Sequence, residues 1–328
     1  MEQIVFIEPE MLVATWMTGW PAKELKRRGY DSALCARGHS LPKLHDDVTV
    51  VLHVLNRTWE DGDRLLTSLD LCKLIRDNAA RLIVAFSDDL TQLLELEPGE
   101  PRERARLLHG QIPEICRMAS KIVVTTPRLA EVYGRWGEVA VAAPTLPRWV
   151  LEMPRKPREN RVAWMGHMAG KVHGRDWDML QPYARHLPPL RLIGTERGAA
   201  DVLRSWGCTD VEVVPGSADQ RKLYRELGRA RAAIVPLVDT PFTRGKSWIK
   251  PMEFMARGVQ PFASAHPEYQ RLDELTMAVP TFEHPAELVA AVATYWQECG
   301  GDDLPGVLLE NGLVMEEAGG DAWEKALI

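Results

Sequence analysis

One short segment, PFTRGKSWIKPMEFMARGVQPFAS, places charged side chains at helical spacing. Lys246, Lys250 and Glu253 fall on one face, because residues three, four and seven apart share a side of an α-helix. Its internal proline is tolerated only in a first turn, so the helix must begin near Ser247. Lys246 and Ser247 thus lie at a positive helix end whose free N–H groups attract anions. We expect a nucleotide there, with its diphosphate on that end and its ribose hydroxyls on Glu253, although an exposed helix with an ordinary Lys–Glu pair fits the same spacing.

A second stretch, RVAWMGHMAGKVHGRDW, reads as a strand, a loop rich in glycine and histidine, and a helix start. Gly166 and Gly170 allow the backbone to approach a ligand closely. The dinucleotide fingerprint GxGxxG is absent. His173 and Asp176 stand just before the helix, and Asp176 is expected to be its N-cap. Gly166 and His173 are candidate donor-binding residues.

Candidate residues for a second substrate lie in the first half of the chain. AFSDDL places Asp88 and Asp89 at the carboxyl end of a strand, where one carboxylate can cap the next helix and the other can orient an acceptor hydroxyl. We assign Asp88 to acceptor binding and Asp89 to catalysis. Gly19 and Trp20 begin another helix and are also predicted to bind the acceptor, with a core role for the tryptophan as the alternative.

Three further features of the chain are weaker candidates. His53 and His109 can line a ligand site, but a structural histidine is the better expectation for each. The basic run Lys23–Arg28 is usually a solvated helix face. Its alternative is contact with an anionic acceptor, to which the linker residues Arg155, Lys156 and Arg158 could also contribute.

The elements that must position these residues alternate regularly. QIVFIE, DVTVVLHVL, ARLIVAF, SKIVVTT and EVAVAAP are predicted strands in the first half, and RVAWMG, LRLIG, VEVVPG, RAAIVPL and VQPFAS are predicted strands in the second. Helices are expected at Trp16–Arg28, Asp61–Asp77, Arg102–Ala119, Pro127–Trp136, Asp176–His186, Arg197–Trp206, Ala218–Gly228, Trp248–Arg257 and Pro285–Glu298. Nearly continuous apolar strands alternating with helices indicate parallel sheets covered on both faces.

This alternation predicts an α/β protein of two tandem Rossmann-like, doubly wound parallel-sheet domains facing a cleft, where ligands bind. The polar, proline-containing stretch LEMPRKPREN interrupts it. We expect an acceptor-binding domain over residues 1–152, a linker over 153–160, a nucleotide-sugar-binding domain over 161–305, and a helical tail over 306–328. The tail could pack back on the first domain.

Composition excludes several classes of protein. The chain has 328 residues and a net charge of −6, which argues mildly against a dedicated nucleic-acid binder. No apolar run is long enough to span a bilayer, and the N-terminus lacks the features of a signal peptide. Five cysteines without a CxxC pair fit a reducing cytoplasm and argue against a zinc site or a disulfide framework.

The two motif stretches together, with SKIVVTTPRLAEVY between them, resemble the GT-B glycosyltransferases, specifically the large retaining family that includes sucrose and glycogen synthases. In that family the second domain carries a pattern KS..K..E..A.G.P, which Lys246, Ser247, Lys250, Glu253 and Gly258 match in order. The family often has another glutamate eight positions before the second one. That position is Gly245 here, so the loop 239–244, which includes Thr243, is expected to hold the sugar of the donor, chiefly through its backbone N–H groups.

The resemblance implies transfer of a sugar, with retention, from a nucleotide-diphosphate sugar to a hydroxyl. UDP or GDP is the expected diphosphate, with no cofactor and no metal, and Lys246 is expected to stabilise the leaving group. The acceptor is left open among a small metabolite, a lipid-linked glycan, a protein side chain and a hydroxylated DNA base, the last as in phage-type members. The alternatives are a nucleotide-sugar epimerase of the same architecture and a non-catalytic nucleotide-sugar-binding protein.

Overall fold

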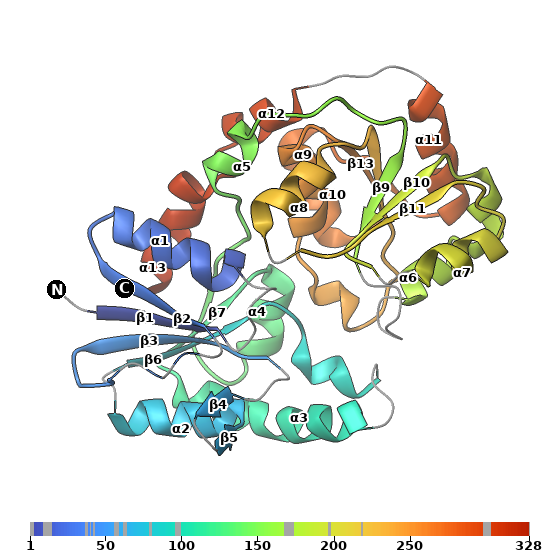
Figure 1. The fold of residues 1–328 in the computed structure, drawn as a ribbon. Helices are drawn as coiled ribbons and strands as arrows, with labels where there is room; N and C mark the ends of the chain where they lie inside the picture. Colours follow the sequence, from blue (N-terminus) through green and yellow to red (C-terminus); the bar gives the residue numbers. More distant parts are fainter. Residues whose placement is uncertain are drawn as a thin grey trace. The chain divides into compact units, whose positions relative to one another are not determined.

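The computed structural model describes residues 3–8, 15–36, 39, 41, 43–55, 59–61, 64–78, 81–95, 100–166, 174–195, 198–217, 219–297 and 303–327. The chain divides into two compact units. The first comprises Met1–Thr145, Gly245–Ser247 and Val314–Ile328, and the second comprises Leu146–Arg244 and Trp248–Leu313. Each unit is built around its own six-stranded sheet (Figure 1).

The sheet of the first unit is parallel throughout and has the strand order β2-β1-β3-β6-β7-β8. Its strands are β1 (Gln3–Glu8), β2 (Asp31–Ala36), β3 (Val48–His53), β6 (Arg81–Phe86), β7 (Lys121–Val124) and β8 (Val139–Val141). The order reverses between β1 and β3. Since β3 is buried along its whole length, both faces of the sheet must be covered.

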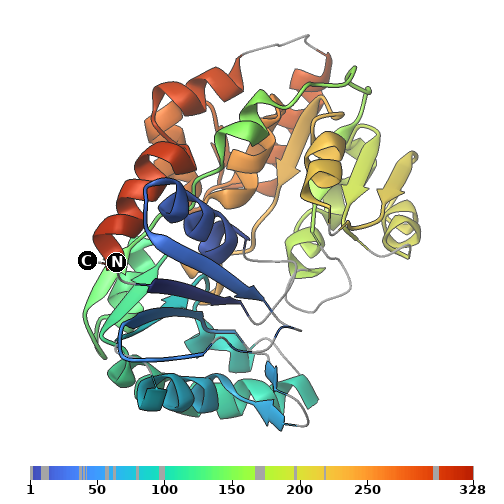
Figure 2. The same cartoon turned by 60° about the vertical axis from the view of Figure 1, so that its left-hand side comes forward.

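Helices cover both faces of this sheet (Figures 1 and 2). They are α1 (Trp20–Arg27), α2 (Ser68–Asn78), α3 (Glu100–Met118), α4 (Pro127–Tyr133) and the C-terminal α13 (Gly320–Leu327), with the short helical segments η1 (Thr15–Gly19), η2 (Leu90–Glu95) and η5 (Met315–Gly319). Helices α2 and α3 lie on one face, and α1 and α13 pack together on the other. Arg28, after α1, forms ion pairs with Asp321 and Glu324 at the C-terminus.

The sheet of the second unit is also parallel and has the order β11-β10-β9-β12-β13-β14. Its strands are β9 (Val162–Met165), β10 (Leu190–Ile193), β11 (Val211–Val214), β12 (Ala232–Val235), β13 (Gln260–Ser264) and β14 (Thr281–Phe282). The strand order reverses between β9 and β12. Such a reversal opens a crevice at the carboxyl ends of the two strands, where α/β sheets bind ligands.

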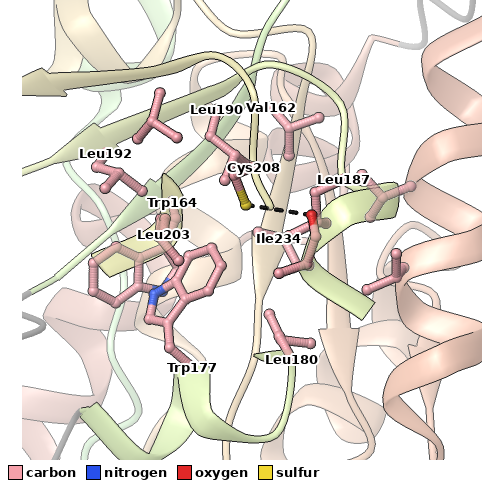
Figure 3. Close-up of a cluster of buried hydrophobic side chains, with 14 of the residues drawn as sticks. Val162, Trp164, Trp177, Leu180, Leu187, Leu190, Leu192, Leu203, Cys208 and Ile234 are labelled. Atoms are coloured by element: carbon pink, nitrogen blue, oxygen red, sulfur yellow. Dashed lines mark hydrogen bonds between the residues drawn. The ribbon is translucent and has the colours of Figure 1, made fainter. Parts of the chain in front are cut away.

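Helices and short helical turns surround this second sheet. They are α5 (Arg148–Glu152), α6 (Gly174–Asp178), η3 (Gln181–His186), α7 (Ala199–Ser205), α8 (Gln220–Leu227), η4 (Thr243–Gly245), α9 (Ile249–Ala256), α10 (Pro267–Thr276), α11 (Pro285–Gln297) and α12 (Leu304–Glu310). The core includes Trp164 and Trp177, whose ring centroids lie 5.4 Å apart in an edge-on contact (Figure 3). Helix α9 packs against both α8 and α12.

Several sequence expectations need correction. The helix expected at Asp61–Asp77 begins only at Ser68, because the chain first forms an antiparallel hairpin of β4 (Trp59–Asp61) and β5 (Arg64–Leu66). Strand β2 and helix α10 were not expected. Strand β2 is at the edge of the sheet and has exposed as well as buried positions, so it lacks a continuous apolar run.

The expected linker is also held more firmly than its composition indicates. The first continuous stretch of the first unit ends at Thr145, whereas the sequence places the boundary at residue 152. Arg257 is buried and donates hydrogen bonds to the carbonyl oxygens of Val150, Met153 and Pro154, at 2.7, 2.9 and 3.2 Å. These bonds attach α5 and the residues that follow it to the second unit.

Candidate functional site

Two motifs that are 84 residues apart in sequence meet at the reversal point of the second sheet. Gly166 follows β9, and Lys250 lies in the first turn of α9, which follows β12. The ammonium of Lys250 lies 5.8 Å from the ring centroid of Trp164 and 3.4 Å from the point where a Cβ on Gly166 would sit. Gly166 has a φ of +151°, and that Cβ would approach the Trp164 ring to 2.9 Å. Only glycine therefore fits without displacing this cation or the ring beneath it.

Helix α9 begins without a side-chain cap. No side chain of its N-cap residue, Trp248, accepts from the first turn, so the helix presents its N–H groups and the positive end of its dipole. Pro251 stands in the first turn, as the sequence predicts. Lys250 is half-buried beside this end, and Ser247 is 7% exposed. The geometry is that of an anion site.

Glu253 lies deeper in the same helix and is buried. Its Oε1 accepts a hydrogen bond of 2.9 Å from the hydroxyl of Tyr224, which comes from α8. Burial raises the pKa of Glu253 to about 7, although the Tyr224 hydrogen bond and the charge of Lys250 oppose that rise. Glu253 can accept from a ribose hydroxyl with its remaining lone pairs, and Tyr224 fixes the orientation of its carboxylate.

The loop between β12 and α9 is ordered by its own side chains. Thr243 is buried, and its hydroxyl donates to the Val238 carbonyl and accepts from the Thr240 N–H. Asp239 and Arg244 form an ion pair at 2.7 Å. The N–H groups of Thr240 and Thr243 are bonded to threonine hydroxyls within the loop. The expectation that this loop offers mainly N–H groups to a ligand therefore fails at these two positions.

Lys246 belongs to a tripeptide that groups with the first unit. Its ammonium lies 2.8 Å from Oδ1 of Asp88, so two of the sequence candidates are brought together. Gly245 beside it is crowded. A Cβ there would lie 2.8 Å from a methyl of Leu129 and 3.4 Å from the backbone nitrogen of Asp89. The missing glutamate of the family pattern would have little room at this position.

The carboxylate of Asp89 caps the helical segment that follows it. It is 2% exposed, and its carboxylate accepts from the N–H and hydroxyl of Thr91, at the start of η2. Burial raises its pKa. Of the two aspartates, Asp89 is therefore the one that caps the next helical segment, and Asp88 is the one that reaches a cation.

The remaining candidates occupy different places. Trp20 is 4% exposed and lies in the core beside Gly19 at the start of α1, so the core alternative describes it better than stacking does. His109 is exposed on α3. Asp176 is within α6 and is buried, and its carboxylate accepts from the Val238 N–H at 3.0 Å, so the expected N-cap role is wrong. His173 and Gly170 lie outside the described residues.

Two site residues were not predicted from the sequence. Tyr224 holds Glu253, and His266 is buried and contacts the Thr243 carbonyl through Nε2 at 2.8 Å. Burial lowers the pKa of His266. Tyr224 occupies an apolar position of an amphipathic helix, and His266 precedes a proline that starts a helix. The sequence pattern therefore does not distinguish either residue from an ordinary core residue.

Comparisons with known proteins give the fold. No protein-family model matches the chain, and no curated protein is similar enough in sequence to count as a relative. Sucrose-phosphate synthase from Thermosynechococcus elongatus is similar in structure, with a TM-score of 0.60 and 13% identity over 99% of this chain and 94% of that one. An α-glucosyltransferase solved with UDP-glucose and DNA containing an abasic site has a TM-score of 0.60 and 11% identity over 98% and 95%.

AviGT4, a glycosyltransferase of avilamycin A biosynthesis, has a TM-score of 0.57 and 10% identity over 100% of this chain and 96% of that one. These similarities span the whole length of the chain. The chain therefore has the GT-B fold, with two Rossmann-like units, as the sequence predicts.

The described residues can also be considered for membrane-spanning helices and for groups of metal-binding side chains. No helix in the described ranges is both long and apolar enough to cross a membrane. Within those same ranges, no three His, Cys, Asp or Glu side chains are grouped so that they could hold a metal ion.

Proposed function

We propose that the protein is a glycosyltransferase that takes a sugar from a nucleotide-diphosphate donor. The observation that carries this proposal is the meeting of Gly166, Lys250 and the uncapped end of α9 at the reversal point of the second sheet. A cation, a close-approach glycine and a positive helix end form a site for phosphate. Glu253, one turn further along α9, is suited to the hydroxyls of the nucleoside.

Each site residue then has a chemical task. Lys250 and the N–H groups of α9 bind the diphosphate, and Lys246 stabilises the charge that develops as the bond to the anomeric carbon breaks. Asp88 holds Lys246 in position until the diphosphate takes over its charge. Transfer with retention and without a metal is the mode that the family resemblance implies, and we include both in the proposal.

UDP is the first nucleotide to test, because the α-glucosyltransferase of the same fold binds UDP-glucose. The acceptor is a hydroxyl compound. A hydroxylated DNA base remains one candidate beside a small metabolite, a glycan or a protein side chain. If DNA is the acceptor, its binding must weaken steeply with salt and with Lys26→Glu or Arg27→Glu, both exposed on α1.

The test is a thermal-unfolding panel with UDP, GDP, ADP, TDP and CDP. A nucleotide at 100 times its Kd stabilises the folded state by about 2.7 kcal/mol, and so raises Tm. Lys250→Ala and Lys246→Ala should each weaken binding of the active nucleotide about tenfold or more, because each removes a charge-assisted hydrogen bond of about 1.5–3 kcal/mol. Lys156→Ala is the matched control, since Lys156 is exposed in the linker and lies outside the site.

Incubation with a nucleotide-diphosphate sugar distinguishes a transferase from an epimerase and from a binding protein. A transferase releases the nucleoside diphosphate and passes the sugar to an acceptor. An epimerase converts the donor when no acceptor is present, and a binding protein leaves the donor intact. If no nucleoside diphosphate raises Tm, or if the two lysine variants bind as well as Lys156→Ala, the proposal is wrong.

A further inference from the structure

Three side chains at the carboxyl ends of strands in the first sheet are connected by hydrogen bonds. Oε2 of Glu8, at the end of β1, lies 3.0 Å from Nδ1 of His53, at the end of β3. Nε2 of His53 lies 3.2 Å from the hydroxyl of Ser87, directly after β6. Thr18 also donates to Oε2 of Glu8, at 3.0 Å. The arrangement of carboxylate, imidazole and hydroxyl is that of groups which activate an oxygen.

The donor and acceptor of each of these hydrogen bonds follow from the buried carboxylate of Glu8. Glu8 is 4% exposed and His53 is 1% exposed, whereas Ser87 is half-buried. A carboxylate can only accept hydrogen bonds, so the Nδ1 of His53 carries the proton and donates. Nε2 must then accept, and the Ser87 hydroxyl must donate to it. The Ser87 oxygen is thereby turned into an acceptor for a hydroxyl that approaches from outside.

The position of these three side chains within the sheet indicates a ligand. The first sheet reverses its strand order between β1 and β3, whose last residues are Glu8 and His53. In doubly wound sheets, ligands bind at the carboxyl ends of the strands at such a reversal. Ser87 is also the neighbour of Asp88, which holds Lys246.

We infer that Ser87 contacts the hydroxyl that receives the sugar, and that His53 and Glu8 act through it as positioning residues. This inference rests on the proposed function. The bond from the anomeric carbon to the diphosphate breaks, and a bond from that carbon to the acceptor oxygen forms. The acceptor proton moves to Ser87 Oγ as the Ser87 proton moves to His53 Nε2, and Glu8 stabilises the imidazolium. The proton then returns to solvent or to the departing diphosphate.

The experiment uses water as the simplest hydroxyl acceptor and UDP-glucose as the donor. Release of UDP and free glucose is measured for the wild type, Ser87→Ala, His53→Gln, Glu8→Gln and the double variant of Ser87 and His53. UDP binding is measured for each by thermal shift. Ser87→Ala and His53→Gln should each lower the release rate about 100-fold, as expected for lost proton transfer. UDP binding should stay within twofold.

A further readout separates proton transfer from structural support. If the residues act as one unit, the double variant is no slower than either single one. Ser87→Ala removes one half-buried hydroxyl and should fold even if the buried His53→Gln does not. Ser120→Ala, at the opposite edge of the same sheet, is the control and should release UDP at the wild-type rate.

Each outcome decides between the two proposals. If Ser87→Ala binds UDP and hydrolyses UDP-glucose within threefold of the wild-type rate, the inference about Ser87 is wrong and the proposed function stands. A wild type that binds UDP but releases no glucose contradicts the inference as well. If the wild type fails to bind any nucleoside diphosphate, the proposed function fails and takes the inference about Ser87 with it.

Discussion

Glu253 shows how burial tunes one residue. Its carboxylate is enclosed by the protein, accepts from Tyr224, and has a pKa of about 7 because burial disfavours its charge. The ordinary pKa of an exposed glutamate is 4.5. The folded chain therefore holds one more proton than the unfolded chain between these two pH values, so the free energy of unfolding must fall as pH rises from 4.5 to 7.

We predict that Glu253→Gln removes this pH dependence. The amide resembles the protonated acid and can still accept from Tyr224, so the variant should match the wild type at pH 4.5 and exceed its stability by about 3 kcal/mol above pH 7. Denaturant unfolding at a series of pH values measures this difference. Glu283→Gln, on an exposed side chain, should follow the wild-type curve. Parallel curves for wild type and Glu253→Gln would contradict the argument.

Sequence reasoning was most successful where the chemistry depends on order along one helix. The positions of Lys250 and Glu253 in α9 and of Pro251 in its first turn follow from spacing alone. The catalytic role assigned to Asp89 did not anticipate that its carboxylate accepts from Thr91 at the start of η2, whereas Asp88 pairs with Lys246. The two aspartates are chemically identical, and only the turn after β6 decides which of them caps the next helical segment. The partners of His53 could not be foreseen either, since Glu8 and Ser87 reach it through strand order, which the sequence does not specify.

At the scale of elements, the contact between the end of β9 and the first turn of α9 is the most important for the candidate donor site. The Lys250 ammonium passes over the Trp164 ring and past Gly166, so a side chain at that glycine must move one of them. Gly194 follows the neighbouring strand β10 and has a φ of +81°, but no atom lies within 4 Å of its would-be Cβ. The two glycines separate backbone strain from crowding.

We predict that Gly166→Ala weakens nucleoside-diphosphate binding at least tenfold, because it displaces Lys250 or the ring beneath it. Gly194→Ala should cost about 1–3 kcal/mol of stability from backbone strain and leave binding unchanged. Titration calorimetry gives the two Kd values, and denaturant unfolding gives the two stabilities. Equal Kd values for Gly166→Ala and Gly194→Ala would show that Gly166 has no role beyond its backbone conformation.

Most elements were predictable because buried parallel strands and amphipathic helices have distinct periods. The exceptions have physical causes. The hairpin β4–β5 occupies the beginning of a stretch whose end is helical, and β2 is an edge strand with several exposed positions. Helix α5 and the residues after it look like a linker by composition, yet Arg257 attaches them to the second unit through their carbonyl oxygens. A sequence pattern does not predict a hydrogen bond between a distant side chain and backbone carbonyl oxygens.

At the scale of the whole molecule, each of the two units carries its own group of candidate site residues. Each sheet reverses its strand order once, and each reversal has polar residues at its carboxyl edge. In the second unit these are Lys250 and the N–H groups at the start of α9, beside Gly166. In the first they are the relay of Glu8, His53 and Ser87. Under the proposed function, the groups of the second unit bind the diphosphate of the donor, and those of the first contact the hydroxyl that receives the sugar.

The most direct test of this account is a crystal structure of the protein with UDP. We predict that the diphosphate contacts the N–H groups at the start of α9 and the ammonium of Lys250, and that the ribose hydroxyls donate to Glu253. A complex in which UDP lies elsewhere, or in which protein side chains fill the start of α9 while UDP is bound, would contradict the central claim.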